Sequence, residues 1–180
     1  MKRLGFIAVL LVTSISAMAQ GASESHLKPP APKSTITVKV NGLTCQTIAG
    51  SSTFGVQAWS WGASNPVTIG SAGGGSGAGK ASISSLNISK QFDQCSPVLF
   101  GAVVTGKSFS SLVLTQEDDK GAVVLTVTLS NLFVESWQMS GSVNEAQPSE
   151  SVSFAFAKVC IAETAGGGKF CFDVAQNKTF

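Results

Sequence analysis

The chain has 180 residues, of which 12 are Lys or Arg, 10 are Asp or Glu, one is His and four are Cys. Lys2 and Arg3 lie in an N-terminal stretch that we expect to be removed, so the processed chain keeps 12 − 2 = 10 basic residues against 10 acidic ones. A formally neutral chain has no electrostatic basis for binding nucleic acid or anionic lipid, and both classes of partner are excluded.

The first 19 residues have the composition of a secretory signal peptide. Lys2 and Arg3 form a basic start, residues 6–12 are apolar, and small residues precede a cleavage site predicted between Ala19 and Gln20. A spanning helix needs roughly 20 apolar residues, more than this run contains. A retained N-terminal anchor is the alternative. No later segment is long and apolar enough to span a membrane, so the processed chain is expected to be soluble and either secreted or periplasmic.

Residues 20–34 are polar, contain three of the six prolines and show no apolar period. This composition is typical of an extended linker. The folded domain is predicted over residues 35–180. A processed chain of roughly 160 residues fits a single domain.

From Thr35 onward the hydrophobic period is two, which predicts half-buried strands. Val123, Leu125, Val127 and Leu129, for example, share one face of a strand. The predicted strands are 35–40, 54–61, 82–89, 108–115, 123–129, 152–156 and 170–174. Most connections between them are too short for parallel crossovers, so we expect antiparallel pairing. The fold class is mainly β, an antiparallel β-barrel of two packed sheets.

One segment, residues 96–106, departs from this period. Ser96 is a candidate N-cap, Pro97 occupies the first helical position, and Gly106 is a candidate C-cap. Bulky residues recur three and four positions apart, with Leu99 near Val103 and Phe100 near Val104. We expect one short α-helix that flanks the barrel.

The four cysteines are even in number and lack the paired spacing of a zinc site, which favours disulfides in an exported chain. A hairpin folded between residues 165 and 166 would place Cys160 directly opposite Cys171, at a distance that a disulfide spans. Elimination then leaves Cys45 with Cys95. Four cysteines allow three connectivities, and buried free thiols are a further alternative.

The glycine-rich run 70–80 contains Gly74-x-x-x-x-Gly79-Lys80, which is similar to a phosphate-binding P-loop. Ala81 stands where a P-loop needs a Ser or Thr hydroxyl for magnesium. A predicted strand, not a helix, then follows. The run is therefore interpreted as a glycine loop between strands.

No arrangement of residues indicates catalysis. Nucleophilic catalysis needs a base near the serine or cysteine, and the only histidine, His26, lies in the predicted linker. The acidic run 117–119 is typical of a solvated turn, and the other carboxylates share no spacing. We expect no enzyme, no catalytic residue, no metal site and no cofactor.

Trp59 and Trp61 lie two positions apart and therefore face the same side of a strand, while Ser60 faces the other. Paired aromatic rings are one way to bind a carbohydrate. The favoured interpretation is that both rings pack in the core, with Ser60 pointing away from it.

Six sequence features over Thr35 to Phe180 resemble, in order and spacing, Hcp, the haemolysin-coregulated tube protein of type VI secretion. They are the segment from Trp59 to Pro66, the glycine loop ending at Lys80, the pair Ser96-Pro97 followed by Thr105-Gly106-Lys107, Ser140-Gly141-Ser142, the strand from Glu150 to Val159, and the terminal segment from Asp173 to Lys178.

The resemblance implies a β-barrel with one helix whose copies assemble into six-membered rings that stack into a tube. By position, Ser60 matches a site that faces the lumen of the ring. The loop from Thr47 to Ser52 and the turn from Gln116 to Gly121 match candidate stacking elements. Implied partners are further copies of the chain and the tip and effector proteins of a secretion system.

The predicted signal peptide is a departure from this family, whose tube is built in the cytoplasm. Disulfides fit a subunit that works outside the reducing cytosol. The first hypothesis is therefore a non-catalytic ring-forming tube subunit, or an exported relative that assembles rings or fibres outside the cytoplasm. The alternative is an extracellular binding module that recognises a glycan or a protein through the Trp59/Trp61 strand.

Overall fold

The computed structural model describes residues 34–45, 52–69 and 77–180. The predicted signal peptide, its cleavage site between Ala19 and Gln20, and residues 20–33 of the predicted linker lie outside these ranges. Most of the predicted stacking loop, residues 46–51, and the first part of the glycine run, residues 70–76, also lie outside them.

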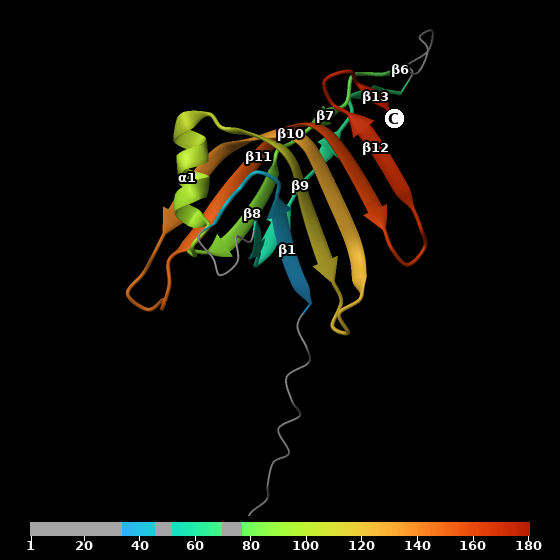
Figure 1. Ribbon diagram of the computed structural model, residues 1–180. Helices are drawn as coiled ribbons and strands as arrows, with labels where there is room; N and C mark the ends of the chain where they lie inside the picture. The colour runs from blue at the N-terminus through green and yellow to red at the C-terminus, as the bar shows by residue number, and fades with distance from the viewer. Residues whose placement is uncertain (1–33, 46–51, 70–76) are drawn as a thin grey trace, which may run out of the picture. The chain divides into compact units, whose positions relative to one another are not determined.

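Thirteen strands and one helix form the described part of the chain, which confirms the mainly β prediction (Figure 1). The predicted strand 54–61 is divided in two, and so is the predicted strand 82–89. In chain order the elements are β1 (Thr35–Val40), β2 (Thr53–Gly55), β3 (Ala58–Ser60), β4 (Ala63–Ser64), β5 (Val67–Thr68), β6 (Gly77–Ala78), β7 (Ser82–Ile83), β8 (Leu86–Gln91), α1 (Ser96–Thr105), β9 (Ser108–Glu117), β10 (Val123–Ser140), β11 (Ser149–Glu163), β12 (Lys169–Asp173) and β13 (Lys178–Thr179).

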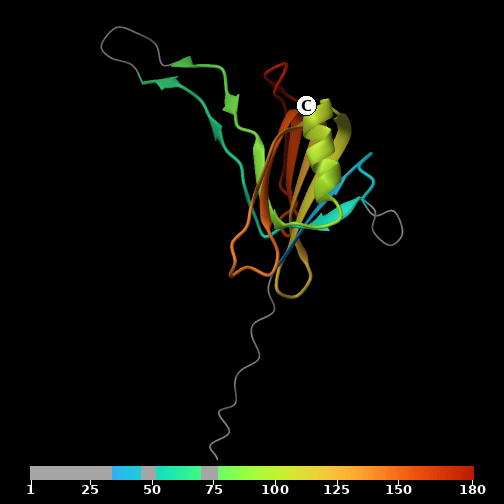
Figure 2. The same cartoon turned by 90° about the vertical axis from the view of Figure 1, so that its left-hand side faces the viewer.

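The main sheet is antiparallel, with strand order β13-β12-β11-β10-β9-β1-β2. The long strand β11 has two partners on its other side. Its first part, residues 149–154, pairs with β8, and its last part, residues 158–162, pairs with β12. β8 in turn pairs with β3. The sheet therefore divides at β11, and its β8 branch curls back toward β1 (Figures 1 and 2).

The segment that contains β2 and β3 connects the two ends of this curled sheet. β2 pairs with β1, whereas β3 pairs with β8. Between them, the Val56 N–H donates to the Ile36 carbonyl oxygen at 2.9 Å and the Gln57 N–H donates to the Ser89 carbonyl oxygen at 2.8 Å. No unbroken ladder closes the sheet among the described residues. This crossover at Val56 and Gln57 supplies the hydrogen-bonded link instead.

The core is apolar, and the predicted alternation holds for only part of each long strand. Val127 and Leu129 of β10 are buried, but the next buried positions are Leu132 and Val134, an odd number of residues further on. Between these pairs, Asn131 has a left-handed backbone with φ of 53°, a conformation that asparagine tolerates better than most residues. The strand bends there and continues well beyond the predicted end at residue 129.

The helix α1 covers the predicted segment, but the predicted N-cap was wrong. Its N-cap is Cys95, not Ser96, because the Ser96 hydroxyl turns back to accept the Asp93 N–H at 2.9 Å. Its buried residues include Leu99, whereas Phe100 and Val104 are 48% and 63% exposed. Gly106 ends the helix with φ of 64°, as predicted for a C-cap.

Candidate assembly and cargo surface

Ser60, the residue predicted to line a ring lumen, lies at the exposed end of β3. It is paired with Asn87 of β8, which is paired with Ser153 of β11. The Ser153 hydroxyl donates a hydrogen bond to Oδ1 of Asn87. Ser60, Asn87 and Ser153 thus form one row across the three strands, and Ala58, Ser89 and Ser151 form the neighbouring row. We call these six residues the serine face.

Two shallow depressions hollow the serine face and meet at Ser89 and Ser151. One, of about 160 Å³, surrounds Ser60 and Asn87, and the other, of about 200 Å³, extends to Gln138. None of the described residues that line them is Lys or Arg. The two depressions therefore present mainly hydroxyl and amide groups, and the carboxylate among their lining residues, Glu150, is buried and paired with Lys90.

The two tryptophans that flank Ser60 point to the opposite side of the strand and pack against the core. The Trp59 ring N–H donates to Oε1 of Gln116 at 3.1 Å, and that of Trp61 donates to the Ser84 carbonyl oxygen at 3.0 Å. Trp61 also meets the ring of Phe156 edge-on, with centroids 6.1 Å apart. Both ring N–H groups therefore have acceptors within the chain, and both rings are partly buried against the core.

A hairpin arm, residues 62–69 and 77–84, extends away from the main sheet (Figure 2). It contains two short ladders, β4 with β7 and β5 with β6. Every residue of β4, β5 and β6 is exposed. Val67 is 61% exposed and Ile69 is 86% exposed. An isolated two-stranded hairpin is only marginally stable in water, so the arm is a candidate for contact with another molecule.

β6 lies within the last part of the glycine run and pairs with β5, while residues 70–76 of the run lie outside the described ranges. The Gly79 N–H donates to the Pro66 carbonyl oxygen at 2.8 Å. A Cβ atom on Gly79 would lie 2.7 Å from Cγ of Pro66, so this position needs glycine for close packing. The chain continues from Lys80 into β7, and no helix N-terminus is available there to hold phosphate.

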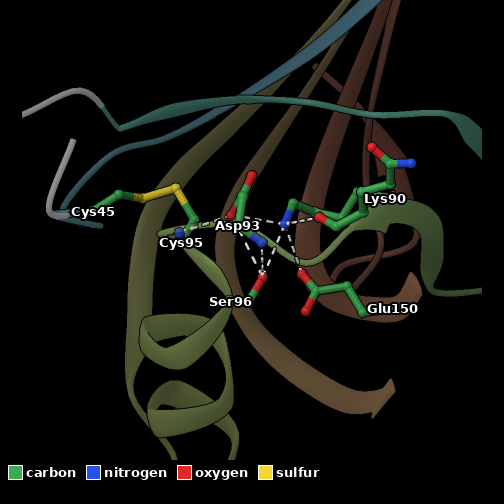
Figure 3. Close-up of a disulfide and its surroundings, with 7 residues drawn as sticks. Cys45, Lys90, Asp93, Cys95, Ser96 and Glu150 are labelled. Carbon is green, nitrogen blue, oxygen red and sulfur yellow. Dashed lines mark hydrogen bonds and ion pairs between the residues drawn. A yellow bond between two sulfur atoms is a disulfide. The ribbon is translucent and has the colours of Figure 1, made fainter. Parts of the chain in front are cut away.

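A buried charged group, the lysine cluster, lies at the start of α1 and joins it to β8 and β11 (Figure 3). Lys90 is 0% exposed. Its Nζ lies 2.8 Å from Oε1 of Glu150 and 2.8 Å from Oδ1 of Asp93. It also donates to the Gln91 carbonyl oxygen at 2.9 Å and to the Ser96 hydroxyl at 3.1 Å. The Lys90 charge is thus fully paired and hydrogen-bonded, as a buried charge must be.

Neighbouring residues complete the lysine cluster. The Trp137 ring N–H donates to Oε2 of Glu150 at 3.0 Å, so both carboxylate oxygens of this buried residue have a partner. The Cys95 N–H donates to Oδ1 of Asp93 at 2.8 Å. Lys90 Nζ also lies 5.4 Å from the ring centre of Phe54, within cation–π range. The cluster fixes the start of α1 against two strands of the sheet.

Sequence reasoning missed the lysine cluster, although Lys90 and Glu150 each continue the period-two pattern of buried residues in their strands. Leu86, Ile88 and Lys90 share one face of β8, and that face is buried. The same period places Glu150 on the buried face of β11 with Val152. A lysine and a glutamate that both fall on predicted core faces of different strands indicate a buried ion pair.

The structure pairs Cys45 with Cys95 and Cys160 with Cys171, with S–S distances of 1.98 and 2.03 Å. Cys160 and Cys171 are directly opposite in the β11–β12 register. Cys45 and Cys95 are each 1% exposed, and their bond ties the segment after β1 to the start of α1 (Figure 3).

The C-terminal turn is anchored on β11 through Asp173. Its Oδ1 accepts the Gln176 N–H at 2.8 Å, and its Oδ2 lies 3.0 Å from Nζ of Lys158. These contacts, the Gln176 hydrogen bond first, hold the pKa of Asp173 below its usual value. Lys158 Nζ also lies 5.1 Å from the ring centre of Phe180. The last residues therefore lie beside β12, with the Phe180 ring near Lys158 of β11.

A family model described as "Type VI secretion system effector, Hcp" matches residues 37–162, from β1 to the end of β11. This range includes the serine face, the arm and the lysine cluster. The chain belongs to the Hcp family. The match confirms the resemblance that the sequence motifs indicated. No curated protein was found that matches the chain.

Solved structures share the Hcp fold. Hcp1 from Salmonella typhimurium is 24% identical with a TM-score of 0.68, over 82% of this chain and 99% of that one. A type VI secretion system effector from Yersinia pestis is 21% identical with a TM-score of 0.60, over 77% of this chain and 99% of that one. A structure described only as a type six secretion system protein has 24% identity and a TM-score of 0.71, over 81% and 99% of the two chains.

Neither a metal-binding cluster nor a membrane-spanning helix occurs in the described ranges. No group of three or more His, Cys, Asp or Glu side chains there is arranged to hold a metal ion. No helix in residues 34–45, 52–69 and 77–180 is long and apolar enough to cross a bilayer.

Proposed function

We propose that the chain is a non-catalytic subunit that assembles with copies of itself into Hcp-type rings of six. Its membership of the Hcp family, a family of tube proteins, supports this proposal. The observation that carries it is the arm, whose Val67 and Ile69 are exposed and lie outside the core cluster of the described residues. We propose a second copy of the chain as the occupant of this surface.

The physical reason is the size of the arm's own ladders. Two pairs of two-residue strands supply few hydrogen bonds and almost no buried apolar area. Packing against a neighbouring subunit would bury both apolar side chains and would keep the arm extended. The turn from Gln116 to Gly121, in which Oδ1 of Asp118 accepts the N–H groups of Lys120 and Ala122, is a rigid candidate for stacking one ring on the next.

We also propose that the serine face lines the lumen of the ring, with Ser60 facing the cargo. A neutral polar surface forms hydrogen bonds that are individually weak, so an effector protein is held reversibly and is released without a large barrier. The same surface repels neither acidic nor basic cargo. Tip and effector proteins of a secretion machine are the expected partners besides the chain itself.

Export is a separate part of the proposal. Residues 1–19 are proposed to be a signal peptide cleaved between Ala19 and Gln20, residues 20–34 a linker, and residues 35–180 the ring-forming domain. The two cysteine pairs at disulfide distance are compatible with an oxidising compartment. An exported ring would act in the periplasm or outside the cell, either with a type VI machine or as an independent assembly.

The arm gives the first test of assembly. The chain exported and processed by a bacterial host should show the mass of a hexamer by light scattering and rings by negative-stain imaging. Replacing Val67 and Ile69 together by aspartate should reduce the mass to that of one subunit, because two charges cannot be buried at the interface. The fold should survive, since both side chains are exposed in the subunit.

Val143→Asp is the matched control, because Val143 is a fully exposed apolar residue in the loop between β10 and β11. This variant should keep the mass of the parent protein. A parent protein that is monomeric at all concentrations would overturn the ring and favour the binding-module alternative. Unchanged rings in the Val67/Ile69 double variant would exclude the arm as the contact.

Ser60→Arg tests the lumen assignment. Because Ser60 is exposed on the side of β3 opposite the core, the subunit should fold and the ring should form, while binding of a basic cargo protein should weaken through charge repulsion. Trp59→Arg, one residue away, should unfold the subunit because Trp59 packs against the core. Circular dichroism and light scattering distinguish the two, and unfolding of Ser60→Arg would contradict the assignment.

A further inference from the structure

A groove of about 650 Å³ lies at the end of the curled sheet where the crossover between β2 and β3 passes from β1 to β8. It is lined by the start of β1, by the crossover, by residues 91–94 between β8 and α1, and by Gln147 in the loop between β10 and β11. This volume is within the range of small-molecule sites. The groove shares no lining residue with the serine face.

Four glutamine side chains from three separate segments converge on this groove: Gln57, Gln91, Gln94 and Gln147. Within the described ranges, none of these side-chain amides makes a hydrogen bond to another residue. Each amide group offers two donors and an acceptor. We call this site the glutamine groove. It presents many neutral hydrogen-bonding groups that the fold itself does not use.

An aromatic ring and a carboxylate lie among these amides. Phe92 is 36% exposed, and its N–H donates to the Pro148 carbonyl oxygen at 2.8 Å, which fixes it beside the loop that carries Gln147. The Asp93 side chain is 39% exposed. Its Oδ1 binds the Lys90 ammonium and accepts the Cys95 N–H, and no hydrogen bond to Oδ2 is found within the described residues.

The lysine cluster holds one wall of the glutamine groove in place. Buried Lys90 donates to the Gln91 carbonyl oxygen and pairs with Asp93, so the backbone on both sides of Phe92 is tied to the core. On the opposite wall, the Gln57 N–H is bonded to the Ser89 carbonyl oxygen. A site formed on an anchored backbone loses less conformational entropy when a ligand binds.

We propose that the glutamine groove binds a neutral oligosaccharide. None of its described lining residues is Lys or Arg, so an anionic ligand would meet only the carboxylate of Asp93. Side-chain amides and a carboxylate match the adjacent hydroxyl or acetamido groups of a sugar, and the exposed ring of Phe92 covers the apolar face of a pyranose.

A peptide ligand is less well matched to the groove. Peptide recognition usually relies on apolar pockets for anchor side chains. The aliphatic residues at the groove are Ile36 and Val56, and both are packed against the core. The chemistry of the groove therefore favours a ligand rich in hydroxyl groups. The proposal is independent of ring assembly, because every group it uses belongs to one subunit.

The test is a titration of the exported, processed protein with tri-N-acetylchitotriose and, separately, with maltotriose. Binding is measured by saturation-transfer NMR and by calorimetry. At least one of the two should bind with a dissociation constant on the order of 1 mM or tighter. The double variant Gln91→Ala/Gln147→Ala should weaken binding by at least about tenfold, because two amide partners are lost. Phe92→Ala should weaken it as well, and Phe92→Tyr should retain it.

Gln176→Ala is the matched control, since Gln176 is an exposed glutamine in the C-terminal turn and should not affect binding. Circular dichroism of each variant shows that the fold is kept. No binding of either sugar up to about 10 mM would overturn the proposal. So would equal binding by the parent and the double variant. Trialanine that binds in place of the sugars, with the same loss in the double variant, would show a peptide site instead.

Discussion

Glu150→Ala should lower the free energy of unfolding by about 3–5 kcal/mol, a large fraction of the stability of a domain of this size. Glu150 is the buried partner of Lys90, with 2.8 Å between Oε1 and Nζ. Its removal leaves a buried ammonium whose remaining carboxylate, Asp93, is partly solvated. It also leaves the Trp137 ring N–H without an acceptor. Urea denaturation followed by tryptophan fluorescence measures the loss.

The double variant Lys90→Met/Glu150→Leu separates the charge effect from packing. Apolar residues of similar volume need no partners, so the double variant should be much more stable than Glu150→Ala and should differ from the parent by about 1–2 kcal/mol. Lys39→Met and Glu145→Ala change exposed residues of the same types and should alter stability by less than about 0.5 kcal/mol. A loss in Glu150→Ala no larger than in these controls would disprove the structural role of the cluster.

Removing the Cys45–Cys95 bond should cost about 4 kcal/mol, and removing the Cys160–Cys171 bond about 3 kcal/mol. The difference arises from loop length, because the first bond closes a sequence separation of 50 residues and the second a separation of only 11. The paired variants Cys45→Ser/Cys95→Ser and Cys160→Ser/Cys171→Ser should therefore unfold at lower urea concentration than the parent, in that order of severity.

Peptide mapping of the parent under non-reducing conditions should find both linked pairs. Mild reductant should open the Cys160–Cys171 pair first, since both of its cysteines are partly exposed whereas Cys45 and Cys95 are buried. Alkylation of all four cysteines without reduction would show that the chain carries free thiols. Equal stability of the parent and the Cys45→Ser/Cys95→Ser variant would show that this bond does not constrain the unfolded chain.

The sequence was sufficient for the fold class and the helix, because these depend on local period and on capping residues. The alternation of apolar residues correctly predicted β1 and the start of β10. Pro97 and Gly106 predicted the two ends of α1 to within one residue. The ordered motifs gave the family. The register that sets Cys160 opposite Cys171 followed from simple symmetry about the Gly-rich turn.

What the sequence did not show depends on contacts between distant segments. The bend at Asn131 breaks the period of two, so the prediction ended β10 near residue 129 although the strand runs to Ser140. The packing of Phe100, whose ring centre lies 5.2 Å from that of Trp137 and whose side chain remains half exposed, also depends on a contact with a distant strand. The convergence of Lys90 with Asp93, Ser96 and Glu150 requires three elements to be placed together.

The crossover at Val56 and Gln57 has a consequence for aggregation. The segment pairs with β1 through β2 and with β8 through β3, so it forms two short edge strands of three residues each instead of one long one. The edge strand at the other end of the main sheet, β13, has two residues. Short edge strands are poor templates for the indiscriminate strand pairing that leads to amyloid. In the described part of the chain, the proposed self-association would therefore rely on side-chain surfaces such as the arm and not on strand pairing at these edges.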